Sequence, residues 1–152
     1  MNRRAFTLIE LLLVVAIVGL LVTMALPHYF HLQYRAKRAE LAPNVVAIRD
    51  VELFYGAQFD RFLAQPERVP RAVPGPSPVP WERGSNFDEL GWLPDGSVRG
   101  VYSVQVAFDQ AGSSEGDFLV EGAVDLDGDG REAIYTATRS ISTTFINNHI
   151  TY

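Results

Sequence analysis

The stretch that decides the fold of this chain is FTLIELLLVVAIVGLLVTMALP, residues 6–27. As a helix, residues 6–26 would be roughly 31 Å long, enough to cross the hydrocarbon core of a bilayer. The stretch contains one ionisable residue, Glu10, close to its start. A carboxylate is costly in lipid and needs a partner there, unless it lies at headgroup depth. The sequence therefore predicts a transmembrane helix, with Glu10 either paired inside it or placed at the membrane surface.

The five residues before this stretch, MNRRA, contain Arg3 and Arg4. A secretory signal peptide has its small-residue cleavage site after the apolar region. Here the small residue at the junction, Ala5, precedes the apolar region, and no such site follows Leu26. Cleavage at this junction would leave the hydrophobic segment on the mature protein.

Residues 3–10, RRAFTLIE, followed by an apolar run with Gly19 and Pro27, resemble the amino terminus of type IV pilin precursors. The family usually has glycine before the cleavage point, where this chain has Ala5. The resemblance implies that residues 1–5 are a leader peptide. It also implies that a prepilin peptidase cuts between Ala5 and Phe6, and that the new Phe6 amine is methylated.

The same resemblance implies roles in assembly for Glu10, Gly19 and Pro27. Glu10 would face the Phe6 amine of a neighbouring subunit in a helical filament, and a buried charge is tolerable when it is paired. Gly19 and Pro27 would bracket a segment that loses helical structure on assembly, because glycine and proline both weaken a helix. The implied partners are further copies of the chain, the membrane before assembly and a pilus assembly machinery. The implied location is the inner membrane for the precursor, with a cytoplasmic amino terminus, and then the cell surface.

The overall composition describes an acidic chain without cysteine. Its 152 residues carry a net charge of −5, and loss of Arg3 and Arg4 with the leader would make this −7. Nucleic-acid binding is not predicted from such a charge. The absence of cysteine excludes disulfides and thiolate sites. The length predicts one globular domain attached to an extended element.

Apolar residues continue at helical spacing beyond the membrane stretch. They recur every three or four residues and place one stripe along an amphipathic helix: Leu41, Val45, Ile48, Val51, Tyr55, Phe59 and Phe62. We expect a long helix over residues 6–62, with a kink near Leu41 or a restart at Pro43. The stripe predicts that this helix packs against a sheet.

The rest of the chain is predicted to be a connector followed by a sheet. Residues 63–80 contain six prolines and are expected to be an extended connector. Residues 81–152 are expected to form the globular head, with strands over 101–108, 118–124 and 133–139 and an edge strand within 141–146. Residues 111–116 are expected to form a loop. The predicted class is therefore α+β: a long amino-terminal helix on a small antiparallel sheet, as in the type IV pilin fold.

One sequence motif could hold a cation: DLDGDG, residues 125–130. Alternating carboxylates at Asp125, Asp127 and Asp129 resemble the first half of a calcium loop, and Glu132 could be a fourth ligand. The twelfth position of an EF-hand, where glutamate is required, is Thr136 here, so that motif fails. A simple β-hairpin turn remains the alternative, because Asp-Gly is a strong hairpin signal.

Catalysis finds little support in the sequence. The three histidines, His28, His31 and His149, have no evident partner, and no nucleophile or nucleotide motif is present. We therefore expect a protein that is not an enzyme. The predicted function is a structural subunit of a type IV pilus. The alternatives are a pseudopilin of a type II secretion system, or a membrane-anchored extracytoplasmic calcium-binding module that does not polymerise.

Overall fold

The computed structural model describes residues 6–107 and 116–146. Two compact units are present, Met1–Tyr34 and Arg35–Tyr152, and each is described by itself. The predicted leader with Ala5, most of the predicted loop at 111–116, and His149 lie outside the described residues.

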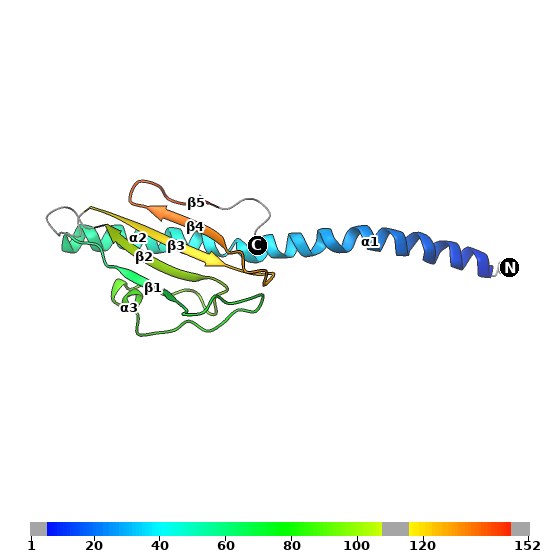
Figure 1. The fold of residues 1–152 in the computed structure, drawn as a ribbon, viewed down its shortest axis with the longest axis horizontal. Helices are drawn as coiled ribbons and strands as arrows, with labels where there is room; N and C mark the ends of the chain where they lie inside the picture. The colour runs from blue at the N-terminus through cyan, green and yellow to red at the C-terminus, as the bar shows by residue number, and fades with distance from the viewer. Residues whose placement is uncertain (1–5, 108–115, 147–152) are drawn as a thin grey trace, which may run out of the picture. The chain divides into compact units, whose positions relative to one another are not determined.

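Helix α1, Leu8–Arg38, contains the predicted membrane stretch except for its first two residues, Phe6 and Thr7 (Figure 1). None of its residues is buried, although most of those before Phe30 are apolar. Its most apolar window has a mean hydropathy of 2.8, so the helix is long and apolar enough to span a bilayer. Pro27 lies inside the helix without ending it.

Helix α2, Leu41–Phe59, follows after a two-residue turn at Ala39 and Glu40. Pro43 falls in the first turn of α2, where a backbone N–H has no partner within the helix, and its missing donor is therefore tolerated. The predicted interruption near Leu41 is confirmed, and the restart comes two residues before Pro43. Arg99 fixes the turn: its backbone N and its Nη1 lie 3.1 Å and 3.0 Å from the two carboxylate oxygens of Glu40.

The apolar stripe of α2 faces the sheet, as predicted. Leu41, Val45 and Ile48 are fully buried, whereas Phe59 is 52% exposed at the helix end. The helix ends three residues earlier than expected, because Asp60 adopts a left-handed conformation with φ of 53° and its N–H bonds the carbonyl of Gly56. Phe62 then turns back into the core as a residue of the following loop.

The head contains a five-stranded antiparallel sheet in which every strand pairs with its neighbours in the sequence (Figure 1). The short helix α3, Asn86–Leu90, precedes its second strand. The strand bounds are β1 Gln65–Val69, β2 Val101–Ala107, β3 Asp117–Val124, β4 Ala133–Thr138 and β5 Thr144–Phe145. The four strands expected from the sequence are present within one or two residues, although the edge strand β5 is shorter than the segment expected to contain it.

Strand β1 lies inside the segment predicted to be a connector, and this is a correction to the sequence analysis. It pairs with β2 through Gln65 opposite Val104 and Val69 opposite Tyr102, with an irregularity in between. Pro66 removes one donor, which an edge strand tolerates better than a central one. Another part of the connector is also tied to the head, because Val79 bridges Val98.

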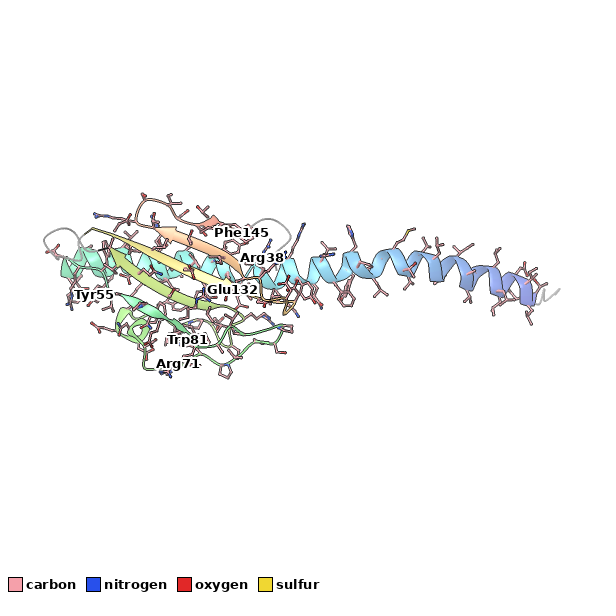
Figure 2. All side chains as sticks on the ribbon, in the orientation of Figure 1. Arg38, Tyr55, Arg71, Trp81, Glu132 and Phe145 are labelled. Carbon is pink, nitrogen blue, oxygen red and sulfur yellow. The ribbon has the colours of Figure 1, made fainter. Side chains whose placement is uncertain are left out.

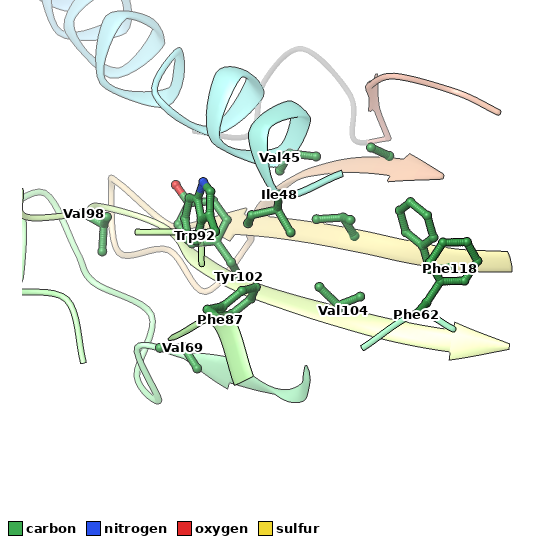
Figure 3. Close-up of a cluster of buried hydrophobic side chains, with 12 residues drawn as sticks. Val45, Ile48, Phe62, Val69, Phe87, Trp92, Val98, Tyr102, Val104 and Phe118 are labelled. Carbon is green, nitrogen blue, oxygen red and sulfur yellow. The ribbon is translucent and has the colours of Figure 1, made fainter. Parts of the chain in front are cut away.

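The core lies between α2 and one face of the sheet (Figure 3). Val45 and Ile48 from the helix meet Tyr102, Val104 and Val120 from the sheet in a cluster of buried side chains. An aromatic group formed by Trp81, Phe87, Trp92 and Tyr102 extends this core toward the connector, with ring centroids 5.2–6.2 Å apart. The stabilisation comes mainly from removing these apolar surfaces from water.

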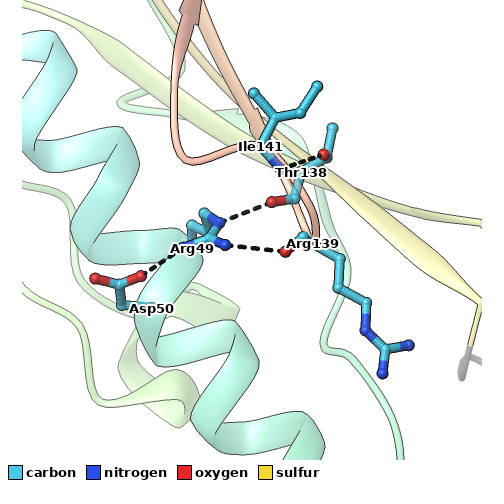
Figure 4. Close-up of polar contacts among 5 residues, drawn as sticks. All are labelled: Arg49, Asp50, Thr138, Arg139 and Ile141. Atoms are coloured by element: carbon cyan, nitrogen blue, oxygen red, sulfur yellow. Dashed lines mark hydrogen bonds and ion pairs between the residues drawn. The ribbon is translucent and has the colours of Figure 1, made fainter.

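Arginine side chains tie the elements together in this chain without disulfides. Arg68 of β1 lies 2.9 Å from Glu121 of β3 and 2.7 Å from Glu132, so it spans β2. Arg49 of α2 donates to the carbonyls of Thr138 and Arg139 at the end of β4, at 2.8 Å and 2.9 Å (Figure 4).

A cation–π contact ties the carboxyl end of α1 to the edge of the sheet. The guanidinium of Arg38 lies 4.4 Å from the centre of the Phe145 ring in β5 (Figure 2). Phe145 in turn stacks against Tyr135 of β4, with ring centroids 4.8 Å apart. These contacts secure the short strand β5, which otherwise holds few ladder hydrogen bonds.

Candidate functional site

The first turn of α1 forms a capping box. The backbone N and the Oγ1 of Thr7 donate to Glu10 Oε2 at 3.0 Å and 2.8 Å, and Glu10 N donates to Thr7 Oγ1 at 3.3 Å. This reciprocal arrangement satisfies helix donors that have no partner within the helix. The T-x-x-E spacing of residues 7–10 is the sequence signal for this box, although only Glu10 is predicted from the sequence to have a role.

This geometry shows one use of Glu10, and the predicted pairing with a neighbouring subunit would be a second. In the single chain its carboxylate caps its own helix, and the side chain is exposed. Its neighbour across the capping box, Thr7, is bonded directly to Phe6, whose amine would become the new terminus after cleavage. A cation brought near this carboxylate would compete with neutral donors, and charge-assisted hydrogen bonds are the stronger ones. Ala5, on the other side of the predicted cleavage, lies outside the described residues.

Gly19 and Pro27 both lie within the continuous helix α1. A Cβ added at Gly19 would meet nothing within 4 Å, so no packing against the described part of the chain requires glycine there. The prediction that the segment between them loses helical structure concerns the assembled filament. It stays a prediction.

The structure brings Asp125, Asp127 and Asp129 together in the loop between β3 and β4. One carboxylate oxygen from each lies within 4.8 Å of the others. Backbone donors already occupy part of this cluster: Asp125 accepts from Gly128 N at 2.8 Å and from Gly130 N at 3.0 Å. Desolvation and the two neighbouring carboxylates raise the pKa of Asp127 above its ordinary range. The loop is thus ordered by its own hydrogen bonds and carries concentrated negative charge.

Glu132, the predicted fourth ligand, is not part of this cluster. Its Oε1 lies 2.7 Å from Arg68 Nη1, in the ion pair that ties β1 to the sheet. The three aspartates are chemically suited to a hard cation such as calcium, which takes six to eight oxygen ligands. Further ligands would have to come from backbone carbonyls and water. Calcium binding stays a prediction for Asp125, Asp127 and Asp129.

If the loop holds calcium, the full chain in detergent micelles should melt at a higher temperature in millimolar calcium than in chelator. A ligand that binds only the folded state adds about 2.7 kcal/mol of stability at a free concentration a hundredfold above its Kd. A variant with all three aspartates changed to asparagine keeps side-chain acceptors for the backbone bonds and should lose the difference. Equal melting temperatures with and without calcium would leave the loop as an acidic hairpin turn.

Comparison with known proteins bears on the amino-terminal segment directly. Residues 1–26 match the family model of the prokaryotic N-terminal methylation motif. The chain is 31% identical over 126 residues to the type IV major pilin protein PilA of Myxococcus xanthus, an alignment that covers 82% of this chain and 44% of that pilin. It is also 26% identical over 92 residues to the type II secretion system core protein G of Klebsiella pneumoniae, covering 60% of this chain and 64% of that protein. No solved structure matches significantly.

The methylation motif, the helix-on-sheet fold and these similarities support a type IV pilin-like prepilin. The chain spans less than two thirds of the length of either relative. One relative is named as a pilin and the other as a secretion-system core protein, and both similarities are compatible with a subunit of a pilin-like filament.

Proposed function

We propose that this chain is a structural subunit of a type IV pilus, which polymerises through α1 after its leader is removed. The observation that carries the proposal is the exposed apolar surface of α1, together with the single carboxylate of Glu10 in its first turn. A membrane covers such a surface before assembly, and helices of other subunits would cover it in a filament. A simple membrane anchor would use Glu10 only as a helix cap, a role that an uncharged glutamine could also fill, whereas a filament would use its charge to set the position of the next subunit.

Two exposed aromatic side chains on the head support contacts between neighbouring subunits. Phe54 is 70% exposed on α2, although the rest of that helix buries its apolar stripe against the sheet. Phe59, at the end of the same helix, is 52% exposed. Large exposed aromatic side chains are common where proteins associate. Both residues therefore suit contacts between neighbouring heads.

Filaments sheared from cells that express the chain should contain a form that begins at Phe6 with a methylated amine. Intact-mass measurement of that form tests the proposal, because leader removal and methylation both change the mass by known amounts. Assembled filaments that retain residues 1–5 would contradict it. Ala5→Gly should be processed at least as well as the natural chain, whereas a bulky or charged residue at position 5 should block processing and filament formation together.

A pseudopilin of a type II secretion system is the second candidate, and the similarity to the Klebsiella protein favours it. A strain without this chain separates the two. Loss of surface filaments with normal secretion of exported proteins would support the pilus. Loss of secretion with surface filaments unchanged would support the pseudopilin.

A further inference from the structure

Glu52 is a buried carboxylic acid that the proposed function does not use. It lies on the sheet-facing side of α2 and is 0% exposed. Its Oε2 accepts one hydrogen bond, from the backbone N of Leu63 at 3.1 Å. Its Oε1 is buried and has no hydrogen-bond partner within the described residues. A carboxylate held this way loses hydration without full compensation, whereas a neutral carboxylic acid is far cheaper to bury.

Through the hydrogen bond from Leu63, Glu52 holds the turn of residues 60–64, which leads from α2 into β1. Two other contacts also hold the turn: Asn86 Nδ2 donates to the Ala64 carbonyl at 2.7 Å, and the Phe62 ring lies 4.7 Å from that of Phe118. Asp60 has the left-handed φ of 53°, which is uncommon for a residue other than glycine. Phe62 packs so closely on Gly56 that a Cβ there would lie 2.5 Å from its ring. A surface cavity of about 370 Å³, lined in part by Gly56, Asp60 and Phe62, leaves room beside the turn.

We propose that Glu52 is a proton-controlled latch of this turn: the neutral acid keeps residues 60–64 closed on α2, and loss of its proton opens them. Opening would expose the carboxylate to water. The hydrogen bond from Leu63 is the link through which the protonation state acts on the backbone. This inference does not depend on whether the chain forms a pilus.

Most of the ionisable groups on the surrounding elements contact groups other than Glu52. Arg49 bonds to Asp50 and to carbonyls after β4. Arg61 of the turn donates to the Tyr55 hydroxyl at 3.3 Å, and that hydroxyl donates to Glu89 of α3 at 3.1 Å. The Arg139 guanidinium lies 5.8 Å from the centre of the Phe62 ring. Asp60 is exposed beside them in the turn. Within the described residues, Glu52 has no hydrogen bond or ion pair with any of these side chains.

Electrostatics gives the latch its pH range. Burial raises the pKa of Glu52 from 4.5 to about 7, and the hydrogen bond from Leu63 offsets only part of this rise. Because the closed form binds the proton more tightly than an open, hydrated form, closure is favoured at low pH. The free-energy preference for the closed form falls as the pH rises from about 4.5 to about 7, and it changes little at higher pH.

Amide hydrogen exchange of the full chain in detergent micelles tests the latch. After correction for the intrinsic effect of pH on exchange, the equilibrium constant for opening residues 62–64 should increase by up to about two orders of magnitude between pH 5 and pH 8. Exchange in the central strand β3 should change much less. Glu52→Gln cannot ionise, so it should remove the pH dependence at the turn. Glu67→Gln, an exposed carboxylate in β1, should leave it in place and is the matched control.

Two results would overturn the proposal. One is a corrected exchange profile at residues 62–64 that does not change with pH in the natural chain. The other is a pH dependence that persists in Glu52→Gln. If that variant does not fold, titration of the Glu52 carboxyl carbon by NMR in the natural chain decides instead. A pKa in the ordinary range for glutamate would then reject the latch.

Discussion

Glu10→Ala is expected to leave membrane insertion intact and to reduce the yield of ordered filaments at least a hundredfold. Insertion should not suffer, because the change makes the helix more apolar. In an assembled filament the Phe6 amine of a neighbour would lose its counter-charge in an apolar bundle, and a broken buried pair costs about 3–5 kcal/mol. Membrane fractionation measures the first effect, and electron microscopy with quantification of sheared filaments measures the second.

Thr7→Ala separates the capping role of Glu10, which the structure shows, from its proposed pairing with a neighbouring subunit. This variant breaks the capping box but keeps the carboxylate, and loss of a cap costs only about 0.5–2 kcal/mol. We therefore expect Thr7→Ala to assemble far better than Glu10→Ala. Equal defects in the two variants would show that Glu10 acts only as a helix cap, and normal filaments from Glu10→Ala would refute the pairing role.

Gly122→Ala is expected to destabilise the head by about 1–3 kcal/mol, because it overpacks the contact between α2 and β3. A Cβ at residue 122 would lie 2.6 Å from Val45 Cγ2 and 3.3 Å from the Tyr102 ring. Neither neighbour can move away easily, since both are fully buried. Denaturant unfolding followed by circular dichroism measures the loss as a lower midpoint with an unchanged slope.

Val45→Ala provides the test of the mechanism for this second prediction. It removes the atom with which the new Cβ collides, so Gly122→Ala should cost less in that background than in the natural chain. A double-mutant cycle should show the two changes to be coupled by more than about 0.5 kcal/mol. Strict additivity would mean that Gly122 is required for another reason, such as the conformation of β3.

The parts of the fold that follow from local pattern could be predicted from the sequence. The apolar stripe of α2 and the alternation in β2 are periodic, and periodicity reports which face of an element is buried. The amino-terminal motif can also be recognised from the sequence, because the apolar run, the basic leader and Glu10 all lie within a short segment. The same locality applies to the aspartate loop, whose three carboxylates are close in sequence and therefore close in space.

The features that sequence analysis missed depend on distant partners. Strand β1 has the composition of a linker and becomes a strand only because β2 offers it an edge. Glu132 looked like a ligand because it follows the aspartates, but Arg68 binds it from another strand. Glu52 falls on the buried stripe by its spacing, four residues after Ile48 and three before Tyr55, but a carboxylate is not expected to be fully buried, because charged side chains normally turn to solvent. In each case the sequence around the residue was compatible with more than one environment.

The order of the strands has a consequence for how the head forms. Because β2, β3, β4 and β5 pair in the order in which they occur in the chain, their contacts close short loops, and such local topologies fold quickly. The pairing of β1 with β2 is the exception, because residues 70–100 separate the two strands. This closure has the largest entropic cost among the strand pairings and is expected to come late. A chain delivered across a membrane with its amino terminus anchored would then complete its sheet at β1, the strand that directly follows α2 in the sequence.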